Sequence, residues 1–352
     1  MPDQMARQSK RRSRTTRALL LPMVPFYQLA LWLRERRLGS RAEPVRRLRS
    51  PVVSIGNLST GGAGKTPLVI ALGKALAARG LQVSVLTRGY GRRDQLPTRV
   101  ALAGTAEEFG DEPLLIARAG GVVVYVAPER YDAGLLAEGD AAAIAFLGEE
   151  LKQVVHLLDD GFQHRQLHRD LDVLLLGRRD WTDRLLPAGN LREPLSAIRR
   201  ADVLAIPAED PEFEGELRSW GWQGPVWRLW RRMEVPAMDG PVAAFCGIAR
   251  PEQFFDGLEA SGLRLAARKS FPDHHSYTAA DLDKLQKAAR AAGAVELITT
   301  EKDLVRVGNL TSAFPASFPL KTARLRIEID QQDEAIAWLL ARLQSAPANT
   351  SL

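Results

Sequence analysis

The sequence contains a single cysteine, Cys246, among its 352 residues. One cysteine excludes an internal disulfide framework and a zinc site built from cysteines, and it fits a reducing compartment. Internal repeats and long low-complexity segments are also missing. The chain has an ordinary globular composition, 45% hydrophobic and 26% charged, and its seven tryptophans and 21 prolines argue against a simple helical bundle. At roughly 100–200 residues per domain, the length predicts two domains.

No hydrophobic run is long enough to span a bilayer. The N-terminal apolar run, 18–33, has 16 residues and contains Pro22, Pro25 and Gln28, whereas a spanning helix needs about 20 apolar residues. A basic stretch before such a run is typical of a signal peptide, but no small-residue cleavage site follows and the next segment stays basic. We therefore expect neither a membrane span nor an export signal.

Acidic residues are scarce at the N-terminus. Residues 1–50 carry 13 Lys and Arg against 3 Asp and Glu, a balance of +10, whereas the rest carries 35 basic and 39 acidic residues, a balance of −4. The basic character therefore belongs to an N-terminal arm. Because the body is slightly acidic, we expect no nucleic-acid partner, and no protein partner is evident from the sequence.

Two interpretations of the arm remain open. In the first, a solvated basic tail precedes a helix that packs on the body. In the second, an interfacial helix inserts apolar side chains into the headgroup region while neighbouring arginines meet anionic lipids. Its inserted residues would be Phe26, Tyr27, Leu29, Trp32 and Leu33. Only the second interpretation predicts an anionic membrane surface as a partner.

After residue 50, β-branched runs alternate with helical patterns, which predicts an α/β fold with a mostly parallel sheet covered on both faces. The expected strands of a first series are 52–56, 83–87, 122–127, 154–158, 172–176 and 202–206, and its clearest helices are 67–79, 113–119 and 129–138. A second series has expected strands at 242–246, 263–268 and 295–299 and helices at 251–261 and 279–292. Thr278 and Asp281 predict a capping box at the start of the last helix.

Two segments of roughly alternating apolar and basic residues, 226–235 and 321–329, flank the second series. We expect them to pair as a two-stranded linker between domains, and we expect a helix at 331–344 to return to the first domain. The predicted division is an arm with its helix at 1–50, a larger α/β domain at 51–225, a smaller α/β domain with the linker strands at 226–330, and a C-terminal helix at 331–352.

The strongest chemical signal is the segment 59–66, which follows a predicted strand and opens a predicted helix. This is the context of a phosphate-binding P-loop. Backbone N–H groups in such a loop face phosphate oxygens, Lys65 bridges the β- and γ-phosphates, and the Thr66 hydroxyl binds Mg²⁺. The expected phosphate-binding residues are Ser59, Thr60, Gly61, Gly62, Ala63, Gly64, Lys65 and Thr66. Ser59 stands where the usual motif has glycine, and a glycine-rich turn that binds no nucleotide is the alternative.

A P-loop needs an acidic partner for its metal ion. Asp159 and Asp160 follow an apolar strand pattern, in the position of a Walker B acid. A carboxylate at the carboxyl end of a strand beside the P-loop can hold Mg²⁺ directly or through water. Two solvated loop aspartates are the alternative.

Several separated segments together resemble one family, the tetraacyldisaccharide 4′-kinases, which act in lipid A biosynthesis in Gram-negative bacteria. Taken singly, only the P-loop and the 159–164 segment are specific, but the order of the whole set is very specific. The segments are 54–67, 87–91, 109–113, 159–164, 186–194, 271–274 and 299–303, and the resemblance covers roughly residues 15–330.

The resemblance implies a P-loop kinase domain at 51–225, a smaller C-terminal domain, and closure between the two. It further implies ATP-dependent phosphorylation, with Mg²⁺, of the 4′-hydroxyl of a tetraacylated glucosamine disaccharide 1-phosphate. The expected location is the cytoplasmic face of the inner membrane, as a peripheral protein. A basic arm that carries tryptophan suits an acceptor that stays in the bilayer.

A sugar hydroxyl is a poor nucleophile until a base accepts its proton. The resemblance places the catalytic aspartate at Asp111, with His274 as the partner that orients it and tunes its pKa. Since His274 belongs to the second domain, the pair would assemble only when the domains close. A helix cap at Asp111, and a surface histidine pair formed by His274 and His275, remain the alternatives.

Further residues have expected roles in metal or acceptor binding. Glu112, next to the base, and Gln163 join Thr66, Asp159 and Asp160 as candidate Mg²⁺ ligands. Candidate acceptor contacts, from the resemblance or from their loop positions, are Asn57, Arg88, Tyr90, Arg192 and Glu193. For the segment 299–303 we expect only the end of a strand that caps the next helix, and any further role stays open. His164 and His168 have a spacing that could suggest zinc on a helix, but no third ligand is evident.

Two other functions compete with a kinase. A dimeric regulatory P-loop ATPase often carries a lysine immediately before the Gly-Gly of its loop, and here that position is Thr60. A membrane-tethered module in which ATP only switches conformation would hydrolyse ATP slowly and yield no phosphorylated lipid.

The P-loop assignment predicts the effect of removing its lysine. Lys65→Ala is expected to abolish phosphoryl transfer, because no other side chain in the motif can bridge the β- and γ-phosphates. Incubation with γ-labelled ATP and disaccharide 1-phosphate lipid in mixed micelles measures transfer as labelled bis-phosphorylated lipid. Near-normal product formation by the variant would remove the assignment.

Overall fold

The computed structural model describes residues 19–38, 40, 44–62, 64–146 and 153–345. Its strands are β1 (Val52–Asn57), β2 (Gln82–Thr87), β3 (Thr98–Arg99), β4 (Val123–Val126), β5 (Val154–Asp159), β6 (Leu171–Leu175), β7 (Val203–Pro207), β8 (Val226–Glu234), β9 (Val242–Cys246), β10 (Leu265–Ser270), β11 (Glu296–Thr300) and β12 (Leu320–Ile329). Its helices are η1 (Leu21–Met23), α2 (Val24–Arg37), α3 (Lys65–Ala77), α4 (Ala106–Phe109), α5 (Asp111–Ala119), α6 (Arg130–Phe146), α7 (Arg178–Trp181), η2 (Leu195–Arg200), α8 (Pro211–Trp220), α9 (Pro251–Ala260), α10 (Ala279–Ala291), α11 (Glu301–Val307), η3 (Gly308–Ala313) and α12 (Gln332–Ser345).

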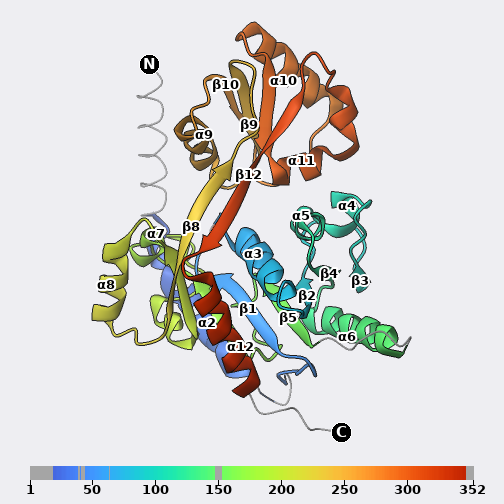
Figure 1. Cartoon of the computed structure of the whole chain (residues 1–352). Helices are drawn as coiled ribbons and strands as arrows, with labels where there is room; N and C mark the ends of the chain where they lie inside the picture. The colour runs from blue at the N-terminus through green and yellow to red at the C-terminus, as the bar shows by residue number, and fades with distance from the viewer. Residues whose placement is uncertain (1–18, 39, 41–43, 63, 147–152, 346–352) are drawn as a thin grey trace.

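These strands join into one sheet with the order β10-β9-β11-β12-β8-β7-β6-β1-β5-β2-β4-β3. Neighbouring strands are parallel except at β12–β8 and β3–β4. The predicted α/β class with a mostly parallel sheet is therefore confirmed. In Figure 1 the strands β9 to β11 lie in the upper part of the molecule, and β1, β2 and β5 lie in the lower part.

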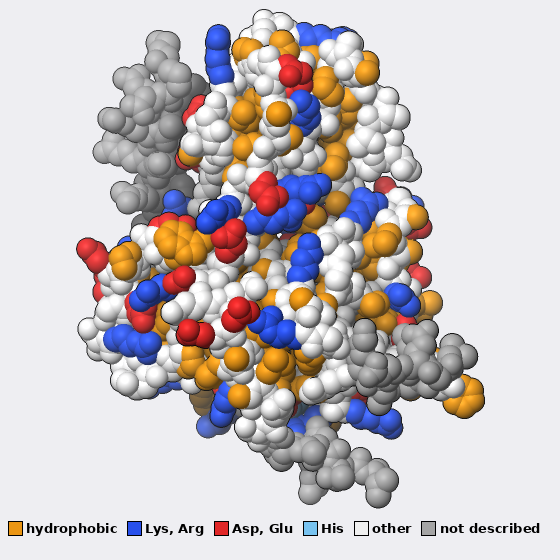
Figure 2. Space-filling model, viewed as in Figure 1, with side chains coloured by type: hydrophobic (Ala, Val, Ile, Leu, Met, Phe, Trp, Pro, Cys, Tyr) orange, Lys and Arg blue, Asp and Glu red, His pale blue; other side chains and the backbone are white. Residues whose placement is uncertain are grey.

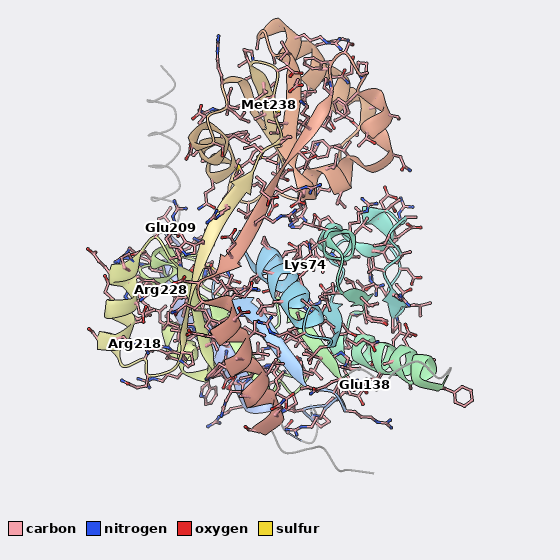
Figure 3. All side chains as sticks on the ribbon, in the orientation of Figure 1. Lys74, Glu138, Glu209, Arg218, Arg228 and Met238 are labelled. Carbon is pink, nitrogen blue, oxygen red and sulfur yellow. The ribbon has the colours of Figure 1, made fainter. Side chains whose placement is uncertain are left out.

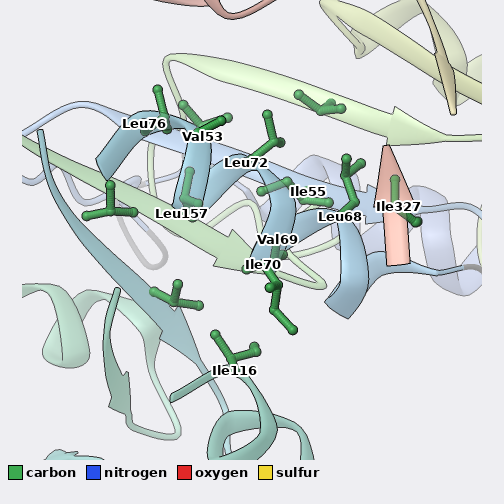
Figure 4. Packing of buried hydrophobic residues seen from close by; sticks show 14 of the residues in the cluster. Val53, Ile55, Leu68, Val69, Ile70, Leu72, Leu76, Ile116, Leu157 and Ile327 are labelled. Atoms are coloured by element: carbon green, nitrogen blue, oxygen red, sulfur yellow. The ribbon is translucent and has the colours of Figure 1, made fainter. Parts of the chain in front are cut away.

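The lower part owes its core to continuous apolar strands. Every residue of β1 is buried, and Leu68, Leu72 and Leu76 of α3 present one face to the sheet. Figure 4 shows this α3 face packed beside Val53 and Leu157. Such burial on both faces of a parallel sheet is why these strands carry no polar alternation. Consequently the loop between β1 and α3 is held at both ends by well-packed elements.

The two segments predicted as a linker do pair. Strands β8 and β12 are antiparallel from Arg324 opposite Glu234 to Ile329 opposite Leu229, and they connect the two parts of the sheet (Figure 1). On β8, Arg228 bonds to Glu214 of the neighbouring α8, at 2.9 and 3.1 Å, and Figure 3 marks Arg228 and Arg218 in this region. On β8 the alternation separates buried Trp227 and Leu229 from exposed Arg228, because one face meets the core and the other meets solvent. Exposed Trp230 and partly buried Arg231 depart from this pattern.

The upper part repeats the α/β pattern. Strand β9 lies between β10 and β11 and is parallel to both, and Cys246 at the end of β9 is buried. The capping box of Thr278 and Asp281 is present at the start of α10, as predicted. The C-terminal helix α12 packs Ile336 and Leu339 into the hydrophobic cluster of the lower part. The exact domain limits stay a prediction.

Helix α2 corrects one part of the sequence prediction. Tyr27, which the interfacial interpretation inserts into lipid, points inward instead, and its hydroxyl donates to the carbonyl of Arg192 at 2.9 Å. Val24 also packs against the body. Val24 and Tyr27 are three positions apart and share the helix face that meets the body. Phe26 lies on another face and is 73% exposed. The basic cluster at 7–17 lies outside the described residues, and in the described part of the chain no helix is long and apolar enough to cross a membrane.

Several elements were not predicted, among them β3, α4 and α8. Strand β3 has two residues and α4 four, both below the length at which a periodic pattern is visible. Helix α8 is longer and amphipathic, with Phe213 and Leu217 buried and Pro211 in its first turn. Its signal was therefore present in the sequence.

Gly56 is the tightest contact in the strand that carries the P-loop. A Cβ on this residue would lie 2.5 Å from the Phe162 Cβ and 2.8 Å from its backbone nitrogen. We expect Gly56→Ala to lower the free energy of unfolding by about 1–3 kcal/mol, the usual range for overpacking. Gly139→Ala in α6, where a Cβ meets nothing within 4 Å, is the matched control and is expected to be neutral or stabilising. Urea unfolding monitored by circular dichroism measures both, and equal stabilities would contradict the packing account.

Candidate active site

The P-loop lies between β1 and α3, as the sequence predicts. Gly61, Gly62 and Gly64 have φ angles of +74°, +57° and +89°, in the left-handed region, which glycine enters without steric cost. Gly64 is the N-cap of α3, so unpaired N–H groups of the first helical turn and the positive end of the helix dipole meet at the loop. Ala63 lies outside the described residues. The loop therefore has the conformation of an anion-binding turn.

Lys65 is held beside the loop by polar neighbours. Its ammonium donates to Asn57 Oδ1 at 2.9 Å and lies 3.4 Å from Asp160 Oδ1. Ser59 Oγ accepts from Asn57 Nδ2 at 3.2 Å. The N–H of Thr60 donates to the carbonyl of Asn190 at 2.9 Å, which ties the P-loop to the 186–194 segment. Thus a buried asparagine orients both the lysine and the unusual serine.

Asp160 and Arg192 form the second fixed pair. The Arg192 guanidinium donates to both carboxylate oxygens of Asp160, at 2.9 and 2.8 Å, and reaches Asn57 Oδ1 at 2.6 Å. Burial alone would raise the pKa of Asp160, but hydrogen bonds from Arg192 and the charge of Lys65 outweigh it and hold the pKa well below its ordinary value. Asp160 is consequently ionised. Its backbone φ is +52°, in the left-handed region, where the chain turns after β5.

Asp159 behaves in the opposite way. It ends β5 at 2% exposure, and its Oδ1 has no hydrogen-bond partner among the described residues. Burial raises its pKa, and the charges of Glu112 and Asp160 raise it further. Buried carboxylates are normally paired with a cation or bound to a metal. Asp159, with one oxygen unpartnered and acidic neighbours, therefore has the properties of a metal ligand.

A second cluster brings the two parts of the molecule into contact. Asp111 is the first residue of α5 in the lower part, and its Oδ2 lies 3.1 Å from Nδ1 of His274 in the segment after β10. Arg306 of α11 contacts the same oxygen through Nε at 2.6 Å and Nη2 at 2.5 Å. Lys302, also from α11, donates to Glu112 at 2.7 Å. Three side chains from distant parts of the sequence, His274, Lys302 and Arg306, therefore surround one carboxylate.

The charges around Asp111 set its protonation. Burial would raise its pKa, whereas the hydrogen bond from His274 and the charges of Lys302 and Arg306 lower it, with a net pKa well below the ordinary value. Asp111 is therefore an ionised carboxylate at neutral pH. His274 is the more accessible partner, because its side chain is 36% exposed and that of Asp111 is 7% exposed.

Comparisons with known proteins bear on the whole chain. The profile of the family described as tetraacyldisaccharide-1-P 4′-kinase matches residues 16–344. A tetraacyldisaccharide 4′-kinase from Koribacter versatilis is 40% identical over 301 residues, covering 82% of this chain and 88% of that protein. One from Geobacter metallireducens is 39% identical over 321 residues, covering 84% and 90%. The chain belongs to the tetraacyldisaccharide-1-phosphate 4′-kinase family.

A solved structure agrees with this membership. The LpxK protein of Aquifex aeolicus, crystallised in complex with ATP, superposes with a TM-score of 0.70 at 31% sequence identity, covering 93% of this chain and 99% of that one. The chain is thus a tetraacyldisaccharide 4′-kinase, an ATP-dependent enzyme of lipid A biosynthesis.

The kinase fold gathers most of the predicted site residues into two groups. Asn57, Lys65, Asp160 and Arg192 meet at the P-loop, with Gln163 donating to the carbonyl of Asn57 at 2.9 Å. The other group contains Asp111, Glu112, His274 and Tyr90, whose ring centroid lies 5.5 Å from that of His274. Thr66 is in the first turn of α3, and Arg88 is exposed after β2. Glu193 is buried and pairs with Arg200, so its carboxylate stabilises the loop to which it belongs.

Sequence reasoning missed three cations of the kinase. Lys302 belongs to the 299–303 segment, whose only predicted role was a helix cap; Thr300 does cap α11, accepting from the N–H of Asp303 at 3.0 Å. Arg306 follows one turn later with no motif signal. Arg130 starts α6 and is 6% exposed; burial and the charge of Arg88 lower its pKa to about 10. Only burial beside carboxylates distinguishes these residues from surface arginines and lysines.

Proposed function

We propose that phosphoryl transfer takes place between the P-loop and the Asp111–His274 pair. The observation that carries this proposal is the 3.1 Å contact between Asp111 and His274, because it joins a residue of each part of the molecule at the mouth of a nucleotide-binding loop. ATP phosphates would lie over Gly61 to Gly64, with Lys65 neutralising charge on the β- and γ-phosphates. Ser59, Thr60 and Ala63 complete the loop around them.

In this proposal Asp111 accepts the proton of the 4′-hydroxyl. A carboxylate held by Arg306 and Lys302 is a weak base, since both cations stabilise its ionised form. Binding of ATP and the acceptor must therefore draw these cations away from Asp111, towards the phosphates. His274 then remains as the partner that orients the carboxylate and shares the proton.

The acceptor would reach this pair across exposed side chains. Tyr90 is 70% exposed beside His274, and Arg88 lies at the carboxyl end of the neighbouring strand, where ligands bind in parallel sheets. We assign both to the lipid disaccharide. Asn57 and Arg192 lie deeper and position Lys65 and Asp160, so their contact with the acceptor is indirect. Glu193, through Arg200, supports the loop of Arg192.

The acidic residues fit Mg²⁺. In the described ranges no three His, Cys, Asp or Glu side chains form a ready metal site, but a nucleotide-bound Mg²⁺ needs only one or two carboxylates besides phosphates and waters. Asp159 has an unpaired buried oxygen, and Gln163 Oε1 is also buried without a partner there. With Thr66, Glu112 and Asp160 they would hold the ion, which would neutralise charge on the transferring phosphoryl group.

The dyad assignment predicts strongly non-additive mutations. Asp111→Ala and His274→Ala are each expected to lower kcat by about 10²–10⁴, and the double variant should be no worse than the more severe single variant, because the two side chains act as one unit. His275→Ala is the matched control, since His275 contacts Asp281 at 3.2 Å instead. Steady-state kinetics at saturating ATP measure each variant. Multiplicative losses, or an effect confined to KM, would contradict the dyad.

We also propose that α2 places the kinase on an anionic membrane, at the cytoplasmic face of the inner membrane. Phe26, Leu29, Trp32 and Leu33 of α2 are all exposed, and Arg34, Arg36 and Arg37 follow in its last turn. This combination of apolar and basic groups is typical of interfacial helices. Since Arg34 also donates to the carbonyl of Gln163 at 2.7 Å, the helix would join the membrane surface directly to the active site.

Removal of exposed apolar groups should release the kinase from vesicles. Phe26→Ser combined with Trp32→Ser is expected to reduce the fraction bound to phosphatidylglycerol vesicles at least about tenfold, because each aromatic group contributes roughly 1.5–3 kcal/mol when buried. Leu135→Ser, at a similarly exposed position on α6, serves as control. Flotation measures the bound fraction. Equal binding by the double variant and the wild type would reject the interfacial role of α2.

A further inference from the structure

The 299–303 segment has a defined place in the structure, although the sequence predicts only a helix cap for it. Thr299 donates from its hydroxyl to a carbonyl of β9 at 2.8 Å, and Thr300 caps α11. Asp303 is fully buried and accepts hydrogen bonds from groups of the same upper part. Lys302, by contrast, crosses to the lower part and meets Glu112 of α5. The segment therefore fixes a short helix whose lysine reaches the active site.

Lys302 lies beside two acidic side chains of the site. Its ammonium is 2.7 Å from Oε1 of Glu112 and 4.0 Å from Oδ2 of Asp111. The lysine side chain is 21% exposed, so both contacts are largely shielded from water. Helix α11 faces α5 across the boundary between the two parts (Figure 1), and Figure 2 shows Lys and Arg side chains gathered at this waist. A cation of the upper part thus neutralises acids of the lower part.

Glu112 is also one of the acids proposed above to hold Mg²⁺. Burial raises the pKa of Asp159, and the charge of Glu112 raises it further, so the two carboxylates act on each other. Asp159 keeps a buried oxygen with no partner among the described residues. Buried acidic groups of this kind need a cation nearby. Lys302 supplies one at Glu112, and a metal ion would supply the other.

The ammonium and a metal ion compete for Glu112. A metal ion ligated by this carboxylate would lie next to the ammonium, and like charges at such short range repel strongly. Each cation therefore weakens the hold of Glu112 on the other. By linkage this weakening is reciprocal: whatever free energy the lysine contact costs the metal, the metal costs the lysine contact.

We propose, on the basis of the proposed metal role of Glu112, that Lys302 and Mg²⁺ are alternative partners of this carboxylate, so that metal binding releases the contact between α11 and α5. Because the lysine neutralises Glu112, free metal ions bind weakly. They bind well only when nucleotide phosphates add further oxygen ligands. Lys302 would thereby make the metal enter together with its nucleotide and couple that entry to the movement of the upper part.

Two lysines allow a matched comparison. Lys302→Met removes the charge and keeps an unbranched apolar side chain. Lys321→Met is the control, because Lys321 also lies 2.7 Å from a carboxylate, that of Glu296, and is 27% exposed, but this pair joins β11 to β12 instead of α11 to α5. Lys302→Arg keeps a positive charge at the site and separates the effect of charge from that of substitution alone.

Binding of Mn²⁺ to the full chain without nucleotide tests the competition. Mn²⁺ takes the same oxygen ligands as Mg²⁺, and its free form is measured by electron paramagnetic resonance. Lys302→Met is expected to lower the Kd for Mn²⁺ about tenfold or more, within the usual range of coupling between linked sites. Lys321→Met and Lys302→Arg should leave the Kd unchanged. Addition of Glu112→Gln to Lys302→Met should remove the gain, because the liberated carboxylate is then lost.

Two results would overturn the inference: an unchanged Mn²⁺ affinity in Lys302→Met, or a gain that persists when Glu112→Gln is added. Should Lys302→Met fail to fold, the wild-type kinase decides. Saturating Mn²⁺ is then expected to raise the acylation of Lys302 by a succinimidyl ester relative to that of Lys321, as measured by mass spectrometry. Equal labelling with and without Mn²⁺ rejects the competition.

Glu112→Gln alone distinguishes failure of the premise from failure of the inference. If this variant binds Mn²⁺ in the presence of ATP as tightly as the wild type does, the proposed metal role of Glu112 is wrong. If it binds Mn²⁺ more weakly with ATP while Lys302→Met matches the wild type without ATP, the metal role stands and only the competition is rejected.

Discussion

The Asp111 carboxylate is the point on which the arrangement of the site depends. It belongs to the larger part of the molecule, yet His274 and Arg306, which hold it, belong to the smaller one. A buried ion pair adds little net stability because desolvation of its members offsets their attraction, whereas leaving one member unpaired is costly, about 3–5 kcal/mol. The contact therefore specifies how the two parts meet more than it stabilises the fold.

The network behind Arg306 reinforces this geometry. Asp303, fully buried, accepts from the N–H of Gly247 at 2.9 Å and the hydroxyl of Tyr277 at 3.0 Å, and it pairs with Arg306 at 3.1 Å. The loop after β9, the segment that carries His274 and helix α11 are thereby fixed to one another. As a result, the smaller part presents its site residues as a unit, and a change in any one of them affects the others.

Local patterns in the sequence were enough for the fold and for the position of the glycine-rich loop before α3. Continuous apolar strands, the glycine spacing before Lys65 and the alternation in 226–235 each encode structure within a few residues, and all three predictions hold. Arg306 is different, because its partner Asp111 is 195 positions away and nothing in its neighbourhood reveals burial. Tyr27 was misplaced by the interfacial interpretation for a related reason: an apolar run shows that a helix has a buried face, but not which of its residues the rest of the protein covers.

The linker strands have one more consequence. Arg231 lies on β8 close to Gly64 of the P-loop, and the loops after β9 and β10, which carry Arg250 and His274, belong to the part that β8 and β12 connect to the lower part. A bend in β8 and β12 would therefore move Arg250 and His274 together relative to the P-loop. Closure of the proposed site would then need only a change of curvature in these two strands.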